Sequence, residues 1–252
     1  MTSNLMLHCG GYPITKEDLF EVPLPQRTAT YEPVSHQEII ELVTDKFQNS
    51  FDMEVRQERY GVARDGRQMF GVIDFMSEGE LGPAVGVRNS YDMSMSVGIA
   101  SGKNCFVCDN LCFSGDAVTI LRKHTKNVHD FLPNAVMEAA AKAVFQLADL
   151  SEELNSFREI EVPKQRGYGL IGMMRGNNLI TPRQTSRAME YWVKPPHEEH
   201  AEPNLYCWYQ AINNALKRSA PSTVMERHFN LHRFAKLVRD GLSELLSEET
   251  LW

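Results

Sequence analysis

Three cysteines and two histidines form the pattern in this chain that comes nearest to a metal site. Cys105 and Cys108 are two residues apart, Cys112 follows, and fifteen residues separate Cys108 from His124, with His129 beyond. Thiolate sulfur and imidazole nitrogen are the usual ligands of structural zinc, and this spacing approximates that of a zinc finger. A strand would instead place Cys105 and Cys108 on opposite faces, where free cysteine packs as a small hydrophobe. The sequence therefore favours buried cysteines over a zinc site, whose candidate ligands would be Cys105, Cys108, His124 and His129.

The same residues offer nucleophilic catalysis as a second chemistry. Cys108 or Cys112 beside His124 or His129 would supply a nucleophile and a base. Nothing in the spacing requires such a pair, and the chain has no G-x-S-x-G nucleophile elbow. The sequence leans against an enzyme but leaves this alternative open.

A glycine pattern matches the letters of a dinucleotide-binding motif. Gly167, Gly169 and Gly172 give G-x-G-x-x-G. The functional motif follows an apolar strand, so that the pyrophosphate meets a helix N-terminus. Here the preceding residues 162–166 are polar and basic. We interpret the segment as a Gly-rich loop or a tightly packed helix, and we expect no cofactor.

Basic residues gather in two segments of a chain whose net charge is -7. That charge disfavours a constitutive nucleic-acid binder, but residues 163–189 carry five basic and no acidic side chains. Cations at the rim of a sheet can follow a phosphate backbone, with aromatic residues such as Tyr60 and Tyr91 stacking on bases. A solvated surface of mixed charge is the alternative. The candidate nucleic-acid contacts are Arg88, Lys103, Arg122, Lys123, His124, Lys126, Lys164 and Arg166.

Composition places the chain among cytoplasmic globular proteins. Its 252 residues are 42% apolar and 23% charged, values that are ordinary for a soluble protein. No run approaches the roughly 18 apolar residues of a membrane helix, and the N-terminus lacks the charged region of a secretory signal. Five cysteines, an odd number, indicate a reducing compartment. We expect a protein of the host-cell cytoplasm that does not contact a membrane.

Strand signals occupy the middle of the chain. Alternation from Val85 to Ile99 predicts a half-buried strand or strand pair with one small, polar face. An Asp-Gly turn at Arg64–Arg67 predicts a hairpin between Phe51 and Ser77. After the alternating stretch we expect a turn at Ser101–Asn104, a strand at Cys105–Phe113, a turn at Ser114–Asp116 and a short strand at Ala117–Arg122.

Helix signals lie on either side of these strands. Ser35 with Glu38 predicts a capped helix ending near Asn49, and Pro133 in a first turn predicts a long helix to Leu154. Further helices are expected after Thr181, which precedes Pro182, and at Asn204–Arg218 and Thr223–Leu246. The predicted fold class is α+β, an antiparallel sheet flanked by helices with a mostly helical C-terminal part. The predicted parts, in one compact unit, are an extended arm (1–34), an α+β core (35–157) and a helical part packed on it (158–252).

Two motifs carry a family resemblance. Asn89-Ser90-x-Asp92-x-Ser94 and Phe106-Val107-Cys108-Asp109-Asn110 resemble the core of a phage/plasmid-like protein family of unknown function, the YfjQ/YafZ type, domain of unknown function 932. The likeness covers roughly residues 51–218, and it implies a phage or mobile-element setting without an established activity. The chain departs from the family by Asp109-Asn110-Leu111, where T-N-G is common, and by Cys105 and Cys112. The motif's polar residues, which are Asn89, Ser90, Asp92 and Asn110, either join the strand turns or contact a ligand.

The expected order of elements, helix then strands then long helix, is also similar to the core of Rad52-like single-strand annealing proteins. That analogy implies a groove for single-stranded DNA and a homo-oligomeric ring or filament. Our first hypothesis is therefore a protein that binds single-stranded nucleic acid in recombination or replication. The second is a non-enzymatic factor that binds a host protein on behalf of a mobile element. The third is a Cys/His-dependent enzyme.

Overall fold

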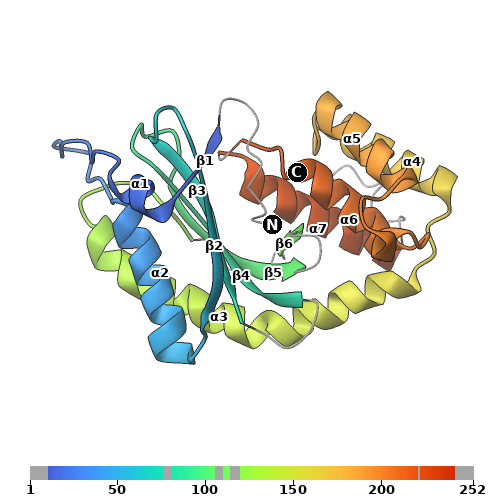
Figure 1. The fold of residues 1–252 in the computed structure, drawn as a ribbon, viewed down its shortest axis with the longest axis horizontal. Helices are drawn as coiled ribbons and strands as arrows, with labels where there is room; N and C mark the ends of the chain where they lie inside the picture. The colour runs from blue at the N-terminus through green and yellow to red at the C-terminus, as the bar shows by residue number, and fades with distance from the viewer. Residues whose placement is uncertain (1–10, 77–80, 106–109, 114–119, 221, 242–252) are drawn as a thin grey trace.

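The computed structural model describes residues 11–76, 81–105, 110–113, 120–220 and 222–241. Figure 1 shows a curved sheet, a long helix beneath it and a group of helices beside it. The elements in chain order are β1 (Tyr12–Ile14), α1 (Lys16–Phe20), α2 (His36–Phe51), β2 (Val55–Ala63), β3 (Gln68–Phe75), β4 (Leu81–Ser90), β5 (Val97–Cys105), β6 (Asn110–Phe113), β7 (Ile120–Arg122), α3 (Val128–Ser156), α4 (Lys164–Gly176), α5 (Pro182–Val193), α6 (Leu205–Leu216) and α7 (Val224–Asp240).

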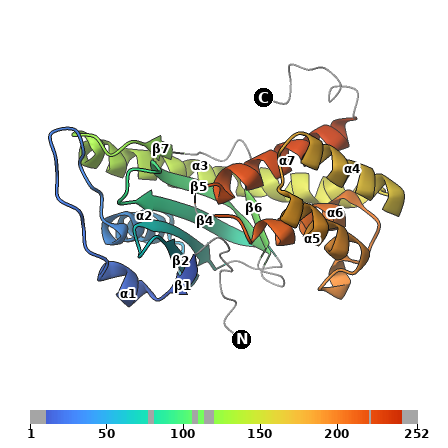
Figure 2. The ribbon, with the colours of Figure 1, turned by 90° about the horizontal axis from the view of Figure 1, so that it is seen from above.

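The seven described strands form one antiparallel sheet in the order β1-β2-β3-β4-β5-β6, with β7 also paired to β5. β7 pairs with the first residues of β5 and β6 with the last, so both lie along the same edge of that strand. Strands β2 to β5 are neighbours because short connections join them, whereas α1 and α2 lie between β1 and β2. The predicted α+β class, with a helical C-terminal part, is confirmed (Figures 1 and 2).

The predicted Asp-Gly hairpin is confirmed as β2 and β3. Arg64, Asp65 and Gly66 all have positive φ, of 53°, 57° and 82°. A side chain on Gly66 would lie 2.7 Å from Val22, so this turn requires glycine both for its backbone angle and for its close contact.

The alternating stretch is a strand pair, β4 and β5, joined by residues 91–96. The expectation that it is half-buried is wrong, since every residue from Ala84 to Ser90 is buried. The turn predicted at Ser101–Asn104 is also wrong. These residues continue β5 because β4 pairs with them on one side and β6 pairs with Gly102–Cys105 on the other. Residues 106–109 of the predicted cysteine strand and the turn at 114–116 lie outside the described residues.

Helices α2 and α3 cover one face of the sheet. Ser35 caps α2, and its side chain accepts a hydrogen bond from the backbone N of Glu38 (2.9 Å), as predicted. The predicted start of α3 at Pro133 is wrong. The helix begins at Val128, where the residues before the proline pack on the sheet, and Pro133 lies inside it.

The other face of the sheet packs against α7. Phe70, Val72 and Ala100 contact Val224 and Met225 there. The small residues that sequence alternation places on this face let the helix approach closely. The helix supplies the cover that removes this polar face from solvent.

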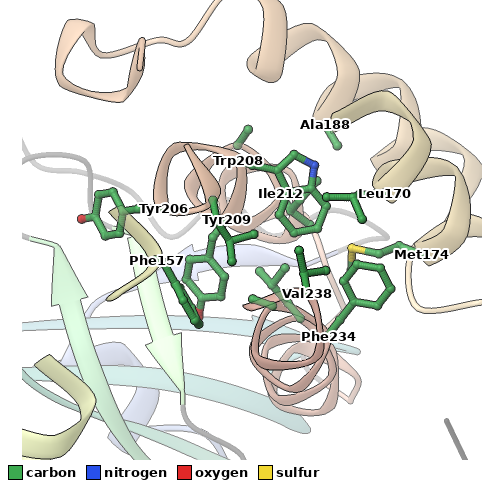
Figure 3. Close-up of a cluster of buried hydrophobic side chains, with 14 of the residues drawn as sticks. Phe157, Leu170, Met174, Ala188, Tyr206, Trp208, Tyr209, Ile212, Phe234 and Val238 are labelled. Atoms are coloured by element: carbon green, nitrogen blue, oxygen red, sulfur yellow. The ribbon is translucent and has the colours of Figure 1, made fainter. Parts of the chain in front are cut away.

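A second core lies among the C-terminal helices (Figure 3). Trp208, Tyr209 and Phe234 are fully buried there, with the end of α3 packed on them through Leu154. The capping box predicted at Thr181 is confirmed, with both reciprocal hydrogen bonds to Gln184 present. Because α3 contributes to both cores, the predicted division of the chain at residues 34 and 157 stays a proposal.

The segment predicted as an extended arm contains β1 and α1. Tyr12 pairs with Val62 at the edge of the sheet, so part of this segment extends the sheet. In the described part of the chain, the helices are too short or too polar to cross a membrane.

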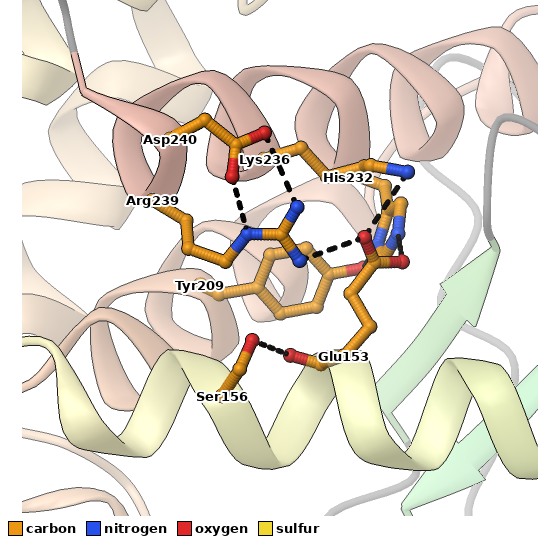
Figure 4. Close-up of polar contacts among 7 residues, drawn as sticks. All are labelled: Glu153, Ser156, Tyr209, His232, Lys236, Arg239 and Asp240. Carbon is orange, nitrogen blue, oxygen red and sulfur yellow. Dashed lines mark hydrogen bonds and ion pairs between the residues drawn. The ribbon is translucent and has the colours of Figure 1, made fainter.

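A charged cluster joins α3 to α7 (Figure 4). The carboxylate of Glu153 contacts His232 (2.8 Å), Lys236 (3.1 Å) and Arg239 (3.1 Å). Burial opposes ionisation of Glu153, but hydrogen bonds and positive charge from His232 and Lys236 outweigh it and lower its pKa to about 2. The Glu153 carboxylate of α3 therefore contacts three basic side chains of α7, of which Arg239 also pairs with Asp240 (2.7 Å).

We expect Glu153→Gln to lower the free energy of unfolding by about 2 kcal/mol, since it removes the carboxylate charge that His232, Lys236 and Arg239 share. Glu152 is its exposed neighbour on α3, and Glu152→Gln should change stability by less than about 0.5 kcal/mol. Urea unfolding of both variants measures the difference. Equal stability of the two variants would show that the cluster does not hold α3 to α7.

Candidate functional site

The structure removes Arg88 from the predicted nucleic-acid surface. Its side chain is 6% exposed and forms an ion pair with Glu226 of α7. Arg88 also donates to the carbonyl of Ser222 (3.3 Å), and a side chain on Gly98 would collide with it at 2.9 Å. Arg88 thus anchors α7 to the sheet. Tyr60 and Tyr91, the aromatic residues expected to stack on bases, are buried as well.

The exposed lysines and arginine among the other predicted contacts, as far as their side chains are described, lie at two separate places. Lys123 and Lys126 are exposed before α3, whereas Lys164 and Arg166 are exposed at the start of α4. The 29 residues of α3 lie between these pairs, a length of about 43 Å. Lys103 and Arg122 lie in β5 and β7, and their side chains are outside the described residues.

His124 is also withdrawn from the surface. It is buried, and its ring lies 5.5 Å from that of Tyr31 in a tilted arrangement. Burial lowers the pKa of its imidazole, so the neutral form is favoured. His129 is half-exposed and contacts Glu38 (2.6 Å).

The predicted zinc ligands do not form a site among the described residues. Cys108 lies outside them, and for Cys105, in β5, only the backbone is described. Within the described ranges no three His, Cys, Asp or Glu side chains are grouped to hold a metal ion. The G-x-G-x-x-G segment is helix α4, where a side chain on Gly167 would lie 2.3 Å from Trp192, so the interpretation as a tightly packed helix is confirmed.

The family-motif residue Asn89 uses its whole amide inside the fold. Its Nδ2 donates to the carbonyl of Val34 (2.8 Å) and to Nδ1 of His36 (3.1 Å), and its Oδ1 accepts from the backbone N of Ser90 (2.9 Å). The side chain is fully buried. Both N–H groups and the oxygen of this amide have protein partners, and complete burial keeps the side chain out of reach of a ligand.

Ser90 and Asp92 shape the connection between β4 and β5. The hydroxyl of Ser90 donates to the carbonyl of Met95 and accepts from its N, both at 3.0 Å. Asp92 accepts from Gln68 (2.9 Å) and from the backbone N of Ser94 (3.0 Å). These contacts favour the interpretation that the motif joins strand turns. Asn110 lies in β6, and its side chain is outside the described residues.

His36 connects this motif to the first hairpin. Its ring stacks on Tyr91 at 4.0 Å, and Nε2 lies 2.9 Å from the carbonyl of Gly66. Because Nδ1 faces the donating amide of Asn89, Nδ1 must accept and Nε2 must carry the proton. Burial lowers the pKa of His36 to about 4, in agreement with this neutral tautomer.

A pocket of about 750 Å³ lies between α5, the connection after α6 and the start of α7. We call it the arginine pocket, because four arginines line it against a single acid, Glu190. Hydroxyl groups supply much of the remaining polar lining. Its charged residues are Arg183, Arg187, Glu190, Arg218 and Arg227, and its hydroxyl residues are Thr181, Ser186, Ser219 and Thr223.

Gln184 fixes the shape of the arginine pocket. It is buried, its Nε2 donates to Ser219 (2.9 Å), and its Oε1 accepts from Arg227 (3.1 Å) and from the backbone N of Thr181 (2.9 Å). Arg227 donates further to the carbonyl of Leu179 (3.0 Å). One amide therefore ties the start of α5 to the loop after α6 and to α7.

The four guanidinium groups differ in their existing contacts. Arg227 is held by these hydrogen bonds, and Arg187 pairs with Glu190 (2.6 Å). Within the described chain, Arg183 and Arg218 have neither an ion pair nor a side-chain hydrogen bond, and both are at least partly exposed. These two are available to an incoming anion.

Sequence reasoning found only part of this site. The excess of basic residues in 163–189 includes Arg183 and Arg187, whereas the predicted contacts in this segment are Lys164 and Arg166. Arg218 and Arg227 come from elements more than 25 positions away. The available signal was a basic residue directly after Thr181-Pro182, at the start of a strongly capped helix.

We expect Asn89→Ala to lower the free energy of unfolding by about 3 kcal/mol, because it strands three buried partners. Asn127 is exposed and makes no side-chain hydrogen bond at the start of α3, so Asn127→Ala should change stability by less than about 0.5 kcal/mol. Chemical unfolding compares the two. If the Asn89→Ala protein were as stable as Asn127→Ala, the structural role of Asn89 would be contradicted and a role in ligand contact would be favoured.

His36 should make the fold sensitive to mild acid. Its folded pKa of about 4 is below the ordinary value of 6.5, so its stabilising effect is complete above pH 6.5 and is lost as the pH falls through 4. Over that interval the unfolded chain gains a proton that the folded chain lacks, which removes about 3 kcal/mol. In His36→Gln this part of the pH dependence should disappear, as measured by urea unfolding at pH 7 to 4. Parallel pH profiles for the two proteins would contradict it.

Comparison with known proteins adds one match. A family model described as Domain of unknown function (DUF932) matches residues 23–239, most of the chain. No curated protein and no solved structure matches it. The fold-level similarity to Rad52-like annealing proteins therefore gains no support from solved structures.

Proposed function

This chain belongs to the DUF932 family, whose description assigns no function, and we propose that it binds single-stranded nucleic acid through the arginine pocket. The observation that carries the proposal is the convergence of four arginines on one pocket, two of them without an internal partner among the described residues. We further propose a role in recombination or replication of a mobile element, in line with the family resemblance.

Guanidinium chemistry matches phosphate. Each arginine presents a planar fork of donors that can bind two phosphate oxygens at once, which lysine cannot do. Arg183 also lies in the first turn of α5, where the helix dipole favours negative charge. An anion placed between Arg183 and Arg218 would meet both effects.

The pocket is prepared before any ligand arrives. Gln184 and Arg227 are already hydrogen-bonded, so ordering them adds no further entropic penalty on binding. Only Arg183 and Arg218 must be fixed. A rigid floor with two adjustable cations is well suited to an anion that enters from solvent.

Pocket geometry favours a single strand over a duplex. A duplex is stiff over about 50 nm, and its phosphates lie on a convex cylinder, so they reach a concave pocket poorly. A single strand bends freely and can direct one phosphate inward. The overall charge of -7 further limits non-specific attraction to duplex surfaces.

Exposed aromatic side chains favour a second candidate, binding of a host protein. Phe131 and Phe145 of α3 are 51% and 77% exposed. Fourteen residues apart, they lie within about 40° of each other around the helix. Recovery of one host protein that is lost in Phe145→Ser, without any oligonucleotide binding, would favour this candidate.

Titration of a labelled single-stranded oligonucleotide at several salt concentrations tests the main proposal. Binding should weaken as salt rises, and Arg183→Gln or Arg218→Gln should each reduce the slope of log K against log salt by about 0.7. Arg27→Gln is the charge-matched control, since Arg27 lies before α2 and pairs with Glu32 (2.7 Å). It should keep the wild-type slope.

Two results would contradict the proposal. One is the absence of salt-dependent binding even at low ionic strength. The other is a loss of binding in Arg27→Gln as large as the loss in Arg183→Gln, which would show that net charge alone is responsible.

A further inference from the structure

The four cations of the arginine pocket line a single cavity. Lys164 and Arg166 are exposed at the start of α4, where the carbonyl of Lys164 accepts from Trp192 at the far end of α5 (3.2 Å). Arg183 lies near the opposite end of this 12-residue helix, nine residues or about 14 Å from Trp192 along its axis. A protein that binds along the interior of a nucleic-acid strand needs cations at successive phosphates. The described lining of the pocket supplies one cluster of cations instead.

The pocket has the dimensions of a nucleotide-scale site. Its volume of about 750 Å³ lies inside the range of small-ligand pockets, roughly 300 to 1,000 Å³. A chain that passes through such a site must enter and leave it, whereas a chain end needs only to enter. The arrangement therefore suits a strand terminus.

Charge also separates a terminal phosphate from an internal one. An internal phosphodiester carries one negative charge, while a phosphate monoester carries about 1.5 to 2 at pH 7 and presents three acceptor oxygens. Arg183 and Arg218, which have neither an ion pair nor a side-chain hydrogen bond within the described chain, bring two positive charges, more than a monoanion can neutralise. The dianion balances this excess more closely.

Glu190 strengthens this discrimination. It holds Arg187 at 2.6 Å, so an entering anion must compete with a carboxylate for that guanidinium. A phosphodiester, with the same charge as the carboxylate, gains little by the exchange. A phosphate monoester, with more charge and more acceptors, gains more.

We infer that the arginine pocket binds a terminal phosphate monoester, the phosphorylated end of a nucleic-acid strand. The inference rests on the proposed function and names the part of the strand that the pocket recognises. A free nucleoside monophosphate carries the same chemical group, and the experiment below separates the two sources.

The test uses the full chain and four fluorescent DNA strands of one sequence: 5′-phosphorylated, 3′-phosphorylated, hydroxyl at both ends, and circular. Anisotropy at pH 7.5 should give at least one phosphorylated end about tenfold tighter binding than the hydroxyl-ended and circular strands, equivalent to about 1.4 kcal/mol. Arg183→Gln should reduce that preference to less than about threefold, and Arg27→Gln should preserve it. Both side chains are exposed, and unchanged melting temperatures verify folding.

Two further measurements sharpen the result. Lowering the pH below 6 protonates the monoester, whose second pKa is about 6, so the preference should shrink there. Glu190→Gln frees Arg187 and should improve binding of the circular strand more than that of the phosphorylated strand, which reduces the preference.

The possible outcomes distinguish recognition of a terminal phosphate from the proposed binding of single-stranded nucleic acid. Equal binding of all four strands, with sensitivity to Arg183→Gln, would overturn the inference and leave nucleic-acid binding intact. Binding of thymidine 5′-monophosphate that depends on Arg183, without binding of any strand, would overturn the proposed function and support the pocket as a monoester site. Failure of every strand and of the mononucleotide would overturn both.

Discussion

A single neutral imidazole holds together the end of the sheet where the hairpins turn. His36 donates to Gly66 in the first hairpin, stacks on Tyr91 after β4, and accepts from Asn89 within β4. It also begins α2, and its backbone N donates to the hydroxyl of Tyr91 (2.8 Å), which satisfies one of the helix's free N–H groups. The network works only with the proton on Nε2, because a second proton on Nδ1 would face the amide of Asn89. The relative positions of α2, the β2–β3 hairpin and β4 thus depend on one tautomer of His36. Burial keeps this imidazole neutral.

The long helix α3 connects the sheet to the C-terminal helices. Its first half packs on the sheet through Val136 and Ala140, and its last turns enter the C-terminal core through Leu154. Arg88 makes a second connection on the opposite face, since it joins β4 to α7. The C-terminal helices are therefore held to the sheet from two sides. The arginine pocket, built from α5, α6 and α7, inherits its rigidity from these contacts and from Gln184.

Local signals in the sequence predicted local structure well. Asp65-Gly66, Ser35 and Thr181 each specify a turn or a cap through their own backbone preferences, and the structure confirms all three. The predictions failed at places where tertiary contacts, and not local preferences, determine the backbone conformation. The polar residues Ser101–Asn104 resemble a turn in the sequence, but β4 and β6 pair with β5 here and keep the backbone extended. Pro133 is tolerated inside α3 because packing on the sheet favours a longer helix. No local rule could pair Asn89 with a carbonyl 55 positions earlier.

The difference between local signals and tertiary contacts also explains why the candidate site lies among the C-terminal helices, whereas the sequence predicted it at the sheet. Sequence shows which residues are basic, but a basic residue is available to a ligand only if the fold leaves its charge without a partner. Arg88 had to be desolvated to reach its place under α7, and a buried guanidinium persists only when paired, so Glu226 accompanies it. Arg183 and Arg218 remain partly hydrated and need no such partner, which is why their charge is still available. Their proximity arises from the packing of α5 against α6, which juxtaposes residues that are 35 positions apart. The phosphate site that we propose here is thus a product of helix packing, and no contiguous motif of the chain encodes it.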